Sequence, residues 1–272
     1  MATTEIDINP FGTNMEVPNG YPIADNLTTN SAQQALSARQ GIRLKEMIQG
    51  VSSDMVINCL GDSITEGWTG SATSTNKWTT QMADFLGCHV NNYGVGGTGI
   101  CYHQTYQPFV TRLNNMVEAS IDLLLIFGGY NDCVSNFATS LGTINDSPAL
   151  GGNFYASFKH LIESAITKYP SAVVAVITPL RSKTNAALNG NTNGITLEAI
   201  VDAEVEVCKY YGIPCYDYFH DGGLSRLSAQ LNLYLGDTVH PNQAGIDKWL
   251  APQFTKFAAD LLANKQPNNV SV

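Results

Sequence analysis

Short apolar runs alternate with helix-like patterns along the chain from residue 55 onward. Apolar residues recur at helical spacing within 154–165, 197–208 and 250–262, and Pro241 suits the first turn of the last of these helices. Strands that alternate with helices predict a parallel sheet covered on both faces. Five runs have the length and composition of its strands: 55–60, 89–95, 122–128, 172–179 and 214–219.

The first 50 residues have a different pattern. Residues 1–30 are rich in Asn, Thr, Pro and Gly and show little periodicity, whereas 31–50 predict one helix with Asn30 as its cap. This contrast predicts a boundary near residue 50. An N-terminal extension with one helix, suited to oligomerisation or attachment, would occupy 1–50, and one larger domain would occupy 51–272.

The predicted topology places several polar segments at one edge of the sheet. Ligands of parallel α/β sheets bind beyond the carboxyl ends of the strands. Ser63, Gly97, Asn131 and the loop after residue 219 all follow predicted strands. Two stretches rich in Gly and Asn, 134–153 and 181–194, are expected to be loops at the same edge, where substrate contacts usually lie.

Composition excludes some classes of function. The chain has 272 residues, 44% of them hydrophobic, and a net charge of -9, so it can bury a large core but lacks the concentrated positive charge that nucleic acids require. No apolar window reaches the roughly 18–20 residues of a membrane span, and the N-terminus lacks a signal-peptide pattern. Six scattered cysteines have no metal-site spacing. We therefore expect no metal, no nucleic acid and no membrane span.

The segment CLGDSITEG ends a predicted strand on an acid beside a serine. Ser63 can act as a nucleophile only if a base takes its proton, and a histidine held by a carboxylate is the usual base. The segment GDTVHPN offers this pair, since Asp237 precedes His240 by three residues. Asp62 is expected to support the turn. The remaining histidines are expected to be structural or exposed, because none has a comparable partner spacing: His89, His103, His160 and His220.

Two further segments could stabilise the negative charge that develops on an attacked carbonyl. Gly97, in NYGVGGTG, has no side chain to cover its backbone N–H. Asn131, in GGYND, carries an amide whose N–H groups could point toward the serine. Both residues also have structural explanations, because Gly97 could serve a tight turn and Asn131 could cap a helix.

These segments together resemble the SGNH (GDSL) hydrolase family. The blocks GDSITEG, NYGVGG, GGYND and DTVH occur in the order of that family, and the resemblance extends over about 55–262. It implies a flavodoxin-like three-layer α/β/α sandwich around a central parallel sheet. It also implies hydrolysis of carboxylic esters through an acyl-enzyme, without a cofactor.

The resemblance assigns a role to five residues. Ser63 would be the nucleophile and, through its backbone N–H, the first donor of the oxyanion hole. Gly97 and Asn131 would complete that hole. His240 would be the base, and Asp237 would orient it.

Two motifs of other enzyme classes can be compared with the same segments. The stretch 94–99, GVGGTG, fits the dinucleotide pattern G-x-G-x-x-G, but Asp122 precedes the next strand, whereas the ribose-binding acid follows it, so no nucleotide is expected. The elbow G-x-S-x-G of α/β-hydrolases is absent. Beside the catalytic blocks lie aromatic residues that could line an acyl or sugar pocket or serve packing: Trp68, Tyr102 and Tyr130.

The segment DNLTTNSAQQALSARQGIRLKEMI resembles a segment of bacteriophage tail-fibre and related gut-bacterial proteins. This resemblance implies that the hydrolase is the head of a fibre-like assembly, a trimer, that acts on cell-surface glycan at a virion or cell surface. The alternative is a leader and one amphipathic helix on a cytoplasmic enzyme.

The sequence therefore predicts a serine esterase, with an acetyl ester on a carbohydrate as the first substrate class. A short-chain lipid ester or a thioester is the enzymatic alternative. An alternative of another class is a non-catalytic receptor-binding head that retains a hydrolase fold.

Overall fold

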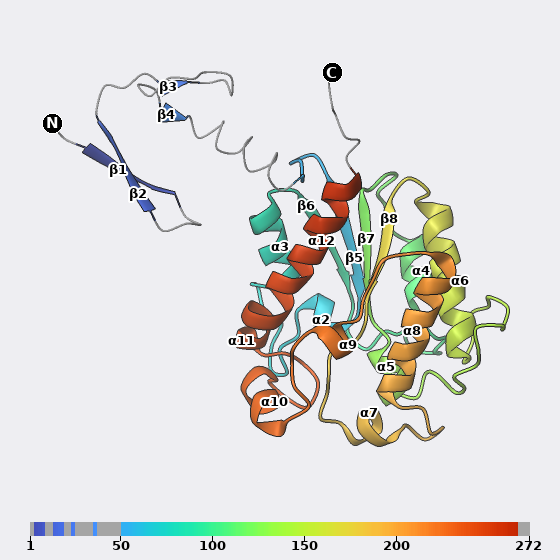
Figure 1. Cartoon of the computed structure of the whole chain (residues 1–272). Helices are drawn as coiled ribbons and strands as arrows, with labels where there is room; N and C mark the ends of the chain where they lie inside the picture. Colours follow the sequence, from blue (N-terminus) through green and yellow to red (C-terminus); the bar gives the residue numbers. More distant parts are fainter. Residues whose placement is uncertain (1–2, 9–12, 19–22, 25–34, 37–49, 266–272) are drawn as a thin grey trace. The chain divides into compact units, whose positions relative to one another are not determined.

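The structure is a computed structural model that describes residues 3–8, 13–18, 23–24, 35–36 and 50–265 (Figure 1). The chain divides into two compact units, Met1–Gly50 and Val51–Val272. In the described part of the first unit, two strand pairs occur: β1 (Thr3–Ile8) pairs antiparallel with β2 (Thr13–Pro18), and β3 (Ile23–Ala24) pairs parallel with β4 (Ala35–Leu36).

The helix predicted over 31–50 is wrong where the structure describes it. Ala35 and Leu36 form β4, so their backbone groups bond to β3 in place of a helical turn. Pairing with a distant strand overrides local periodicity here. Gly50 is the other described residue of that segment, and the rest of the predicted helix, with its cap Asn30, lies outside the described residues.

The second unit contains a parallel sheet in which the strands run in the order β6-β5-β7-β8-β9 (Figure 1). Numbered along this unit, the order is 2-1-3-4-5, which is the flavodoxin-like order, so the predicted fold class is confirmed. The strands are β5 (Val56–Gly61), β6 (His89–Gly94), β7 (Leu123–Phe127), β8 (Val173–Ile177) and β9 (Cys215–Tyr216).

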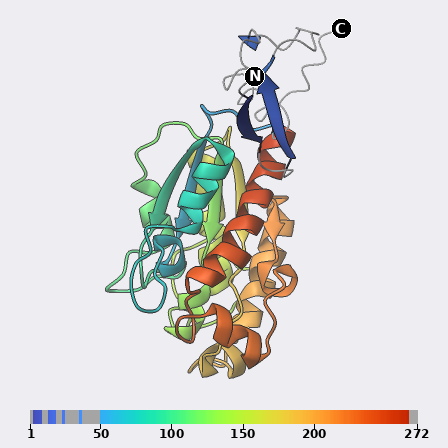
Figure 2. The ribbon, with the colours of Figure 1, turned by 90° about the vertical axis from the view of Figure 1, so that its left-hand side faces the viewer.

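Helices cover both faces of the sheet (Figures 1 and 2). Each face carries its own apolar core. On one face α3 (Trp78–Leu86) and α12 (Ala251–Lys265) pack on β5, β7 and β8. The other face packs against α4 (Phe109–Asn114), α6 (Phe154–Lys168) and α8 (Leu197–Tyr211). Because both faces are buried, β7 and β8 are apolar along their whole length, as the short runs in the sequence indicate.

Short helices lie around the carboxyl edge of the sheet. They are α2 (Ser63–Glu66), α5 (Tyr130–Val134), α7 (Asn185–Asn189), α9 (Tyr218–Asp221), α10 (Ser228–Tyr234), α11 (Gln243–Gly245) and the π-helix η1 (Ile246–Leu250). This edge carries the polar segments discussed below.

Three sequence predictions need correction at this edge. The last strand ends at Tyr216, because the Asp217 side chain accepts the His220 N–H and begins α9. The helix expected from Pro241 begins at Gln243, since the side chain of Asn242 is its cap. The stretch 181–194 is not loop throughout, because it contains α7.

Close packing fixes the first turn after β5. A Cβ atom at Gly61 would lie 2.8 Å from the Phe127 carbonyl oxygen on the neighbouring strand, and one at Gly94 would overlap the backbone of Thr65 and Glu66. Only glycine allows these approaches. They bring α2 directly against the end of β6, which sets the position of Ser63.

Candidate active site

Three neighbouring strands deliver polar groups to the carboxyl edge of the sheet. Ser63 follows β5, Gly97 follows β6 and Asn131 follows β7, as the topology predicts. His240 and Asp237 come from the loop between α10 and α11. The structure thus brings together segments that are up to 177 residues apart in sequence.

A hydroxyl, an imidazole and a carboxylate form a hydrogen-bonded chain at this edge. The Ser63 Oγ lies 2.9 Å from the His240 Nε2, and the His240 Nδ1 lies 2.7 Å from the Asp237 Oδ2. Because the carboxylate can only accept, the proton lies on Nδ1 and the Nε2 lone pair faces the serine hydroxyl. This arrangement can move a proton from the hydroxyl to the imidazole.

Asp237 is held as a carboxylate by its own loop. Its Oδ1 accepts the backbone N–H groups of Val239 and His240, each at 2.7 Å. Partial burial raises the pKa of Asp237, but the hydrogen bonds from the His240 backbone and ring and from Val239 outweigh it, so the pKa lies below its usual value. The three-residue spacing therefore fixes both the imidazole and the charge of its partner.

The turn that carries Ser63 depends on Asp62. The Asp62 carboxylate accepts the Ile64 N–H at 3.0 Å and so caps α2, which agrees with the predicted supporting role. Its side chain is 2% exposed. Burial raises the pKa of Asp62 to about 6, although the Ile64 hydrogen bond and the nearby His240 and Arg112 lower it.

Candidate donors for an oxyanion follow the same three neighbouring strands. Among the described residues, the backbone N–H groups of Ser63 and Gly97 donate to no protein acceptor. Gly97 has a φ of 74°, which favours glycine, and the neighbouring Gly96 N–H is held by the Glu66 carboxylate at 3.0 Å. One N–H of the Asn131 amide donates to the Thr98 carbonyl at 2.9 Å, which leaves the other for a ligand.

Arg112, a buried guanidinium beneath the edge, is a site residue that was not predicted from the sequence. It donates to the Gly61 carbonyl at 2.9 Å, to the Thr98 Oγ1 at 2.7 Å and to the Tyr93 carbonyl. Burial lowers the pKa of Arg112 to about 10, against the opposing charges of Asp62 and Glu66. A lone arginine within the apolar segment FVTRLN was the available signal.

Asp132 was also missed, although it adjoins Asn131 in the block GGYND. Its fully buried carboxylate accepts the N–H groups of Ile100 and Cys101 at 2.7–3.1 Å. Burial raises the pKa of Asp132 against these hydrogen bonds. Asp132 thus ties the Gly97 loop to the helix that carries Asn131.

A third buried acid, Glu204 of α8, packs behind the Gly129 turn. Its side chain is 1% exposed, and its Oε2 has no hydrogen-bond partner among the described residues. Burial raises the pKa of Glu204 well above its usual value. The carboxyl edge is therefore rich in buried acids whose proton affinity is increased.

The three aromatic residues that were predicted to line a substrate pocket differ in their exposure. Trp68 is half-buried and pairs with Thr73, and Tyr102 is 54% exposed. Tyr130 is only 3% exposed, and its hydroxyl lies 2.7 Å from the Ser182 Oγ, so this placement does not fit a contact with substrate. The position of Tyr130 in the sequence does not reveal that its ring lies in the core.

An aromatic residue that was not predicted lies nearer to Gly97. Tyr106 is 43% exposed, and a Cβ at Gly97 would lie 3.1 Å from its ring. Its ring continues into a row with His103 and Phe137, at centroid distances of 5.4 and 6.1 Å. We call these three residues the aromatic row.

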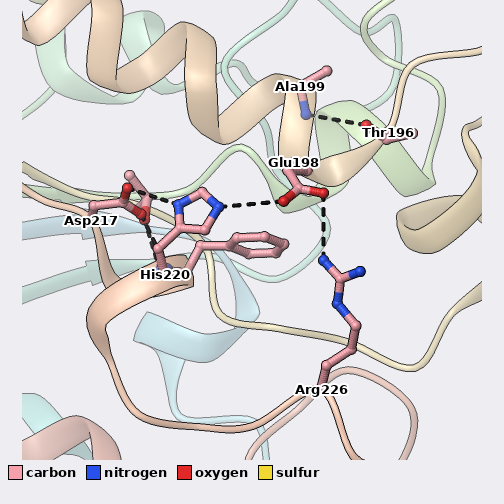
Figure 3. Close-up of polar contacts among 8 residues, drawn as sticks. Thr196, Glu198, Ala199, Asp217, His220 and Arg226 are labelled. Atoms are coloured by element: carbon pink, nitrogen blue, oxygen red, sulfur yellow. Dashed lines mark hydrogen bonds and ion pairs between the residues drawn. The ribbon is translucent and has the colours of Figure 1, made fainter.

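His220 is exposed, as expected, but the expectation that it lacks a partner at the spacing of Asp237 and His240 is wrong. Asp217 and His220 have the same spacing as Asp237 and His240, and the His220 Nδ1 lies 2.8 Å from the Asp217 Oδ2 (Figure 3). Its Nε2, however, faces the Glu198 carboxylate at 3.4 Å. The His220 imidazole therefore faces a carboxylate, whereas the His240 imidazole faces the Ser63 hydroxyl.

Two broader features follow from the described residues. No group of three or more His, Cys, Asp or Glu side chains among them could hold a metal ion. Within the same residues, no helix has both the length and the apolar character needed to cross a membrane.

Comparison with known families gives two matches. The GDSL-like lipase/acylhydrolase family matches residues 59–248, which is more than half of the chain. The phage tail fiber repeats match residues 23–54. Among curated proteins, none matches the chain.

Solved structures share the fold of the second unit. One crystal structure is 28% identical, with a TM-score of 0.64, over 78% of this chain and 96% of its own. A lipase/acylhydrolase from Enterococcus faecalis is 17% identical, with a TM-score of 0.53, over 78% and 94%. A carbohydrate acetylesterase from Sinorhizobium meliloti is 17% identical, with a TM-score of 0.53, over 78% and 99%. At such identities the last two show the fold alone.

The burial of Asp62 predicts a pH-dependent stability. Its folded-state pKa of about 6 lies above the unfolded value of about 3.9, so its favourable contribution is fully present below about pH 4 and is lost as the pH rises through about 6. Asp62→Asn keeps an oxygen for the Ile64 N–H and cannot ionise. The free energy of unfolding of this variant, from denaturant titrations between pH 4 and pH 8, should fall less with pH than that of the wild type, by about 1–3 kcal/mol.

The matched control is Asp84→Asn, an exposed position of α3. Its pH dependence should equal that of the wild type. An Asp62→Asn variant with the full wild-type pH dependence would contradict the assignment of a raised pKa to Asp62.

Proposed function

The chain belongs to the GDSL-like lipase/acylhydrolase family and is an ester-bond hydrolase, and we propose that it releases acetyl groups from carbohydrate through an acyl-enzyme on Ser63. The observation that carries the proposal is the hydrogen-bonded chain from the Ser63 hydroxyl through His240 to Asp237, with links of 2.9 and 2.7 Å.

In the proposed first step, the Ser63 Oγ attacks the ester carbonyl while the His240 Nε2 takes the hydroxyl proton. The imidazolium then gives this proton to the leaving alcohol, so that an acetyl-serine remains. A water molecule, deprotonated by the same imidazole, attacks the acetyl-serine. The bond from the acetyl carbon to the Ser63 Oγ breaks, acetate is released, and the imidazolium returns the proton to the Ser63 Oγ. Asp237 holds the imidazole in the tautomer that both steps require.

The developing oxyanion would be stabilised by three donors. We assign these to the backbone N–H groups of Ser63 and Gly97 and to the side-chain amide of Asn131. The support is that the two backbone groups have no protein acceptor among the described residues and that Asn131 commits one N–H to Thr98. Preorganised donors of this kind are each worth about 2.7–4 kcal/mol of barrier reduction.

The choice of a carbohydrate ester rests on the surroundings of the serine. The exposed Tyr106 ring lies beside Gly97 and is backed by the other members of the aromatic row, which suits contact with the C–H face of a sugar. A neighbour of the same fold is a carbohydrate acetylesterase, so the fold supports that chemistry. Trp68 and Tyr102 are proposed as outer contacts. A short-chain lipid ester or a thioester is the alternative substrate.

The N-terminal extension indicates where this activity would take place. Because the phage tail fiber repeats match residues 23–54, we propose that residues 1–50 attach the hydrolase to a fibre-like assembly, as a trimer directed to cell-surface glycan. A head that only binds a receptor is the alternative within this setting, and it would need none of the proton-transfer groups.

The catalytic roles predict large losses of activity. Ser63→Ala should abolish turnover of p-nitrophenyl acetate above background. Asp237→Asn should lower kcat by about 10³–10⁴, because the amide favours the wrong imidazole tautomer. Initial rates with purified variants test both, and Asp221→Asn, an exposed acid of α9, is the control. Wild-type rates no greater than those of Ser63→Ala would favour the receptor-binding head.

The aromatic row predicts a separate effect on glycan substrates. Tyr106→Ala should raise KM for an acetylated xylo-oligosaccharide about tenfold relative to its effect on p-nitrophenyl acetate, since a ring contact is worth roughly 1–2 kcal/mol. Tyr106→Phe keeps the ring and should retain the wild-type ratio of the two substrates. Tyr210→Ala, an exposed tyrosine of α8, is the control. An unchanged ratio in Tyr106→Ala would argue against stacking.

The proposed attachment role predicts the effect of truncation. Removal of residues 1–50 should convert a trimer to a monomer in light-scattering measurements and leave turnover of p-nitrophenyl acetate unchanged, because the second unit has its own two apolar cores. If the truncated and full-length chains have the same assembly state, oligomerisation does not depend on this segment.

A further inference from the structure

A small cavity with two arginines lies beside the proposed catalytic loop. It has a volume of about 30 Å³, which is the size of a water molecule or a carboxylate group. It lies among the segment after β8, the first turn of α8, and α9. Its polar lining comes from Arg181, Ser182, Glu198 and Arg226, and its apolar lining comes from Ala187, Leu188, Leu197 and Phe219.

The acidic groups around this cavity already have partners (Figure 3). The Glu198 Oε2 lies 3.4 Å from the Arg226 guanidinium, and its Oε1 lies 3.4 Å from the His220 Nε2. Asp217 is bonded to the other ring nitrogen of His220 at 2.8 Å. Arg226 and His220 therefore engage both carboxylates.

Arg181 is the one charged residue of the cavity lining that takes part in none of these ion pairs. Its guanidinium lies 4.2 Å from the centroid of the Phe219 ring, and among the described residues it donates no hydrogen bond. Burial and the like charge of Arg226 lower the pKa of Arg181. A guanidinium stacked on an aromatic ring presents its N–H groups in the plane that a carboxylate can meet with two parallel hydrogen bonds.

The cavity adjoins the loop that positions the imidazole. The Ser182 Oγ donates to the Thr238 carbonyl at 3.0 Å, and the Lys183 N–H donates to the same carbonyl at 2.9 Å. Thr238 lies between Asp237 and His240, and Arg181 is one residue, about 3.8 Å along the chain, from Ser182. Ser182 therefore both lines the cavity and holds the loop that carries His240.

We propose that the cavity binds the carboxylate of an acidic sugar that neighbours the acetylated one, with Arg181 as the main ligand and Arg226 beside it. This inference rests on the proposed function and names its substrate class. The chain carries a net charge of -9, so an acidic glycan is repelled elsewhere and needs a local cation to bind.

The test compares two substrates that differ only in charge. Acetate release is measured from an O-acetylated oligogalacturonide and from its carboxyl-reduced counterpart. The wild type should favour the charged substrate in kcat/KM by about tenfold, and Arg181→Ala should lose this preference. Arg181→Lys, which keeps the charge without the planar fork, should retain part of it, and the preference should weaken with salt.

The matched control is Lys209→Ala, which removes one exposed positive charge from the other end of α8 and should keep the wild-type preference. Equal preference in Arg181→Ala and the wild type, or no preference in the wild type, overturns the carboxylate site. Equal losses on both substrates in Arg181→Ala indicate a structural role and also overturn it.

A binding experiment separates this inference from the proposed function. If the wild type hydrolyses none of these esters or p-nitrophenyl acetate, the esterase proposal fails. Calorimetric titration with a non-acetylated oligogalacturonide then decides the site, because Arg181→Ala should bind at least about tenfold more weakly than the wild type. Equal affinities overturn the site.

Discussion

One buried guanidinium links the segments from which the candidate site is built. Arg112 bonds the last carbonyl of β5, a carbonyl near the end of β6 and the Thr98 hydroxyl. It is 8% exposed, and a buried cation is tolerated only when its N–H groups are satisfied. The relative positions of Ser63 and the Gly97 loop therefore depend on this residue, which bonds neither Ser63 nor Gly97 itself.

Buried acids at the same edge also help to hold its loops in position. Asp62 caps the helix of Ser63, and Asp132 ties the Gly97 loop to the helix of Asn131. Glu204 lies behind the Gly129 turn with one oxygen unpartnered. Each of these acids destabilises the fold when it ionises. Their concentration at one edge indicates that preorganisation of the loops is gained at the expense of stability.

Comparison of the two Asp–His pairs shows which contacts come from a local turn and which come from distant parts of the chain. In both, the aspartate accepts the backbone N–H of the histidine three residues on and bonds its Nδ1. The difference is the group that faces Nε2, which is the Ser63 hydroxyl for His240 and the Glu198 carboxylate for His220. The chemistry open to each imidazole is decided by this third partner, which comes from a distant part of the chain.

The sequence alone determined the parallel sheet and the edge where Ser63, Gly97 and Asn131 meet, because apolar runs and helical spacing reflect burial on both faces of a sheet. The flavodoxin-like order of the strands followed only from the family resemblance. The sequence also indicated the Asp237–His240 turn, which is a local arrangement. Tertiary structure decided that Tyr130 is buried, that Tyr106 lies beside Gly97, and that Arg112 and Asp132 bind the edge together. These outcomes depend on contacts between segments that are distant in sequence, and no local pattern of the chain predicts such contacts.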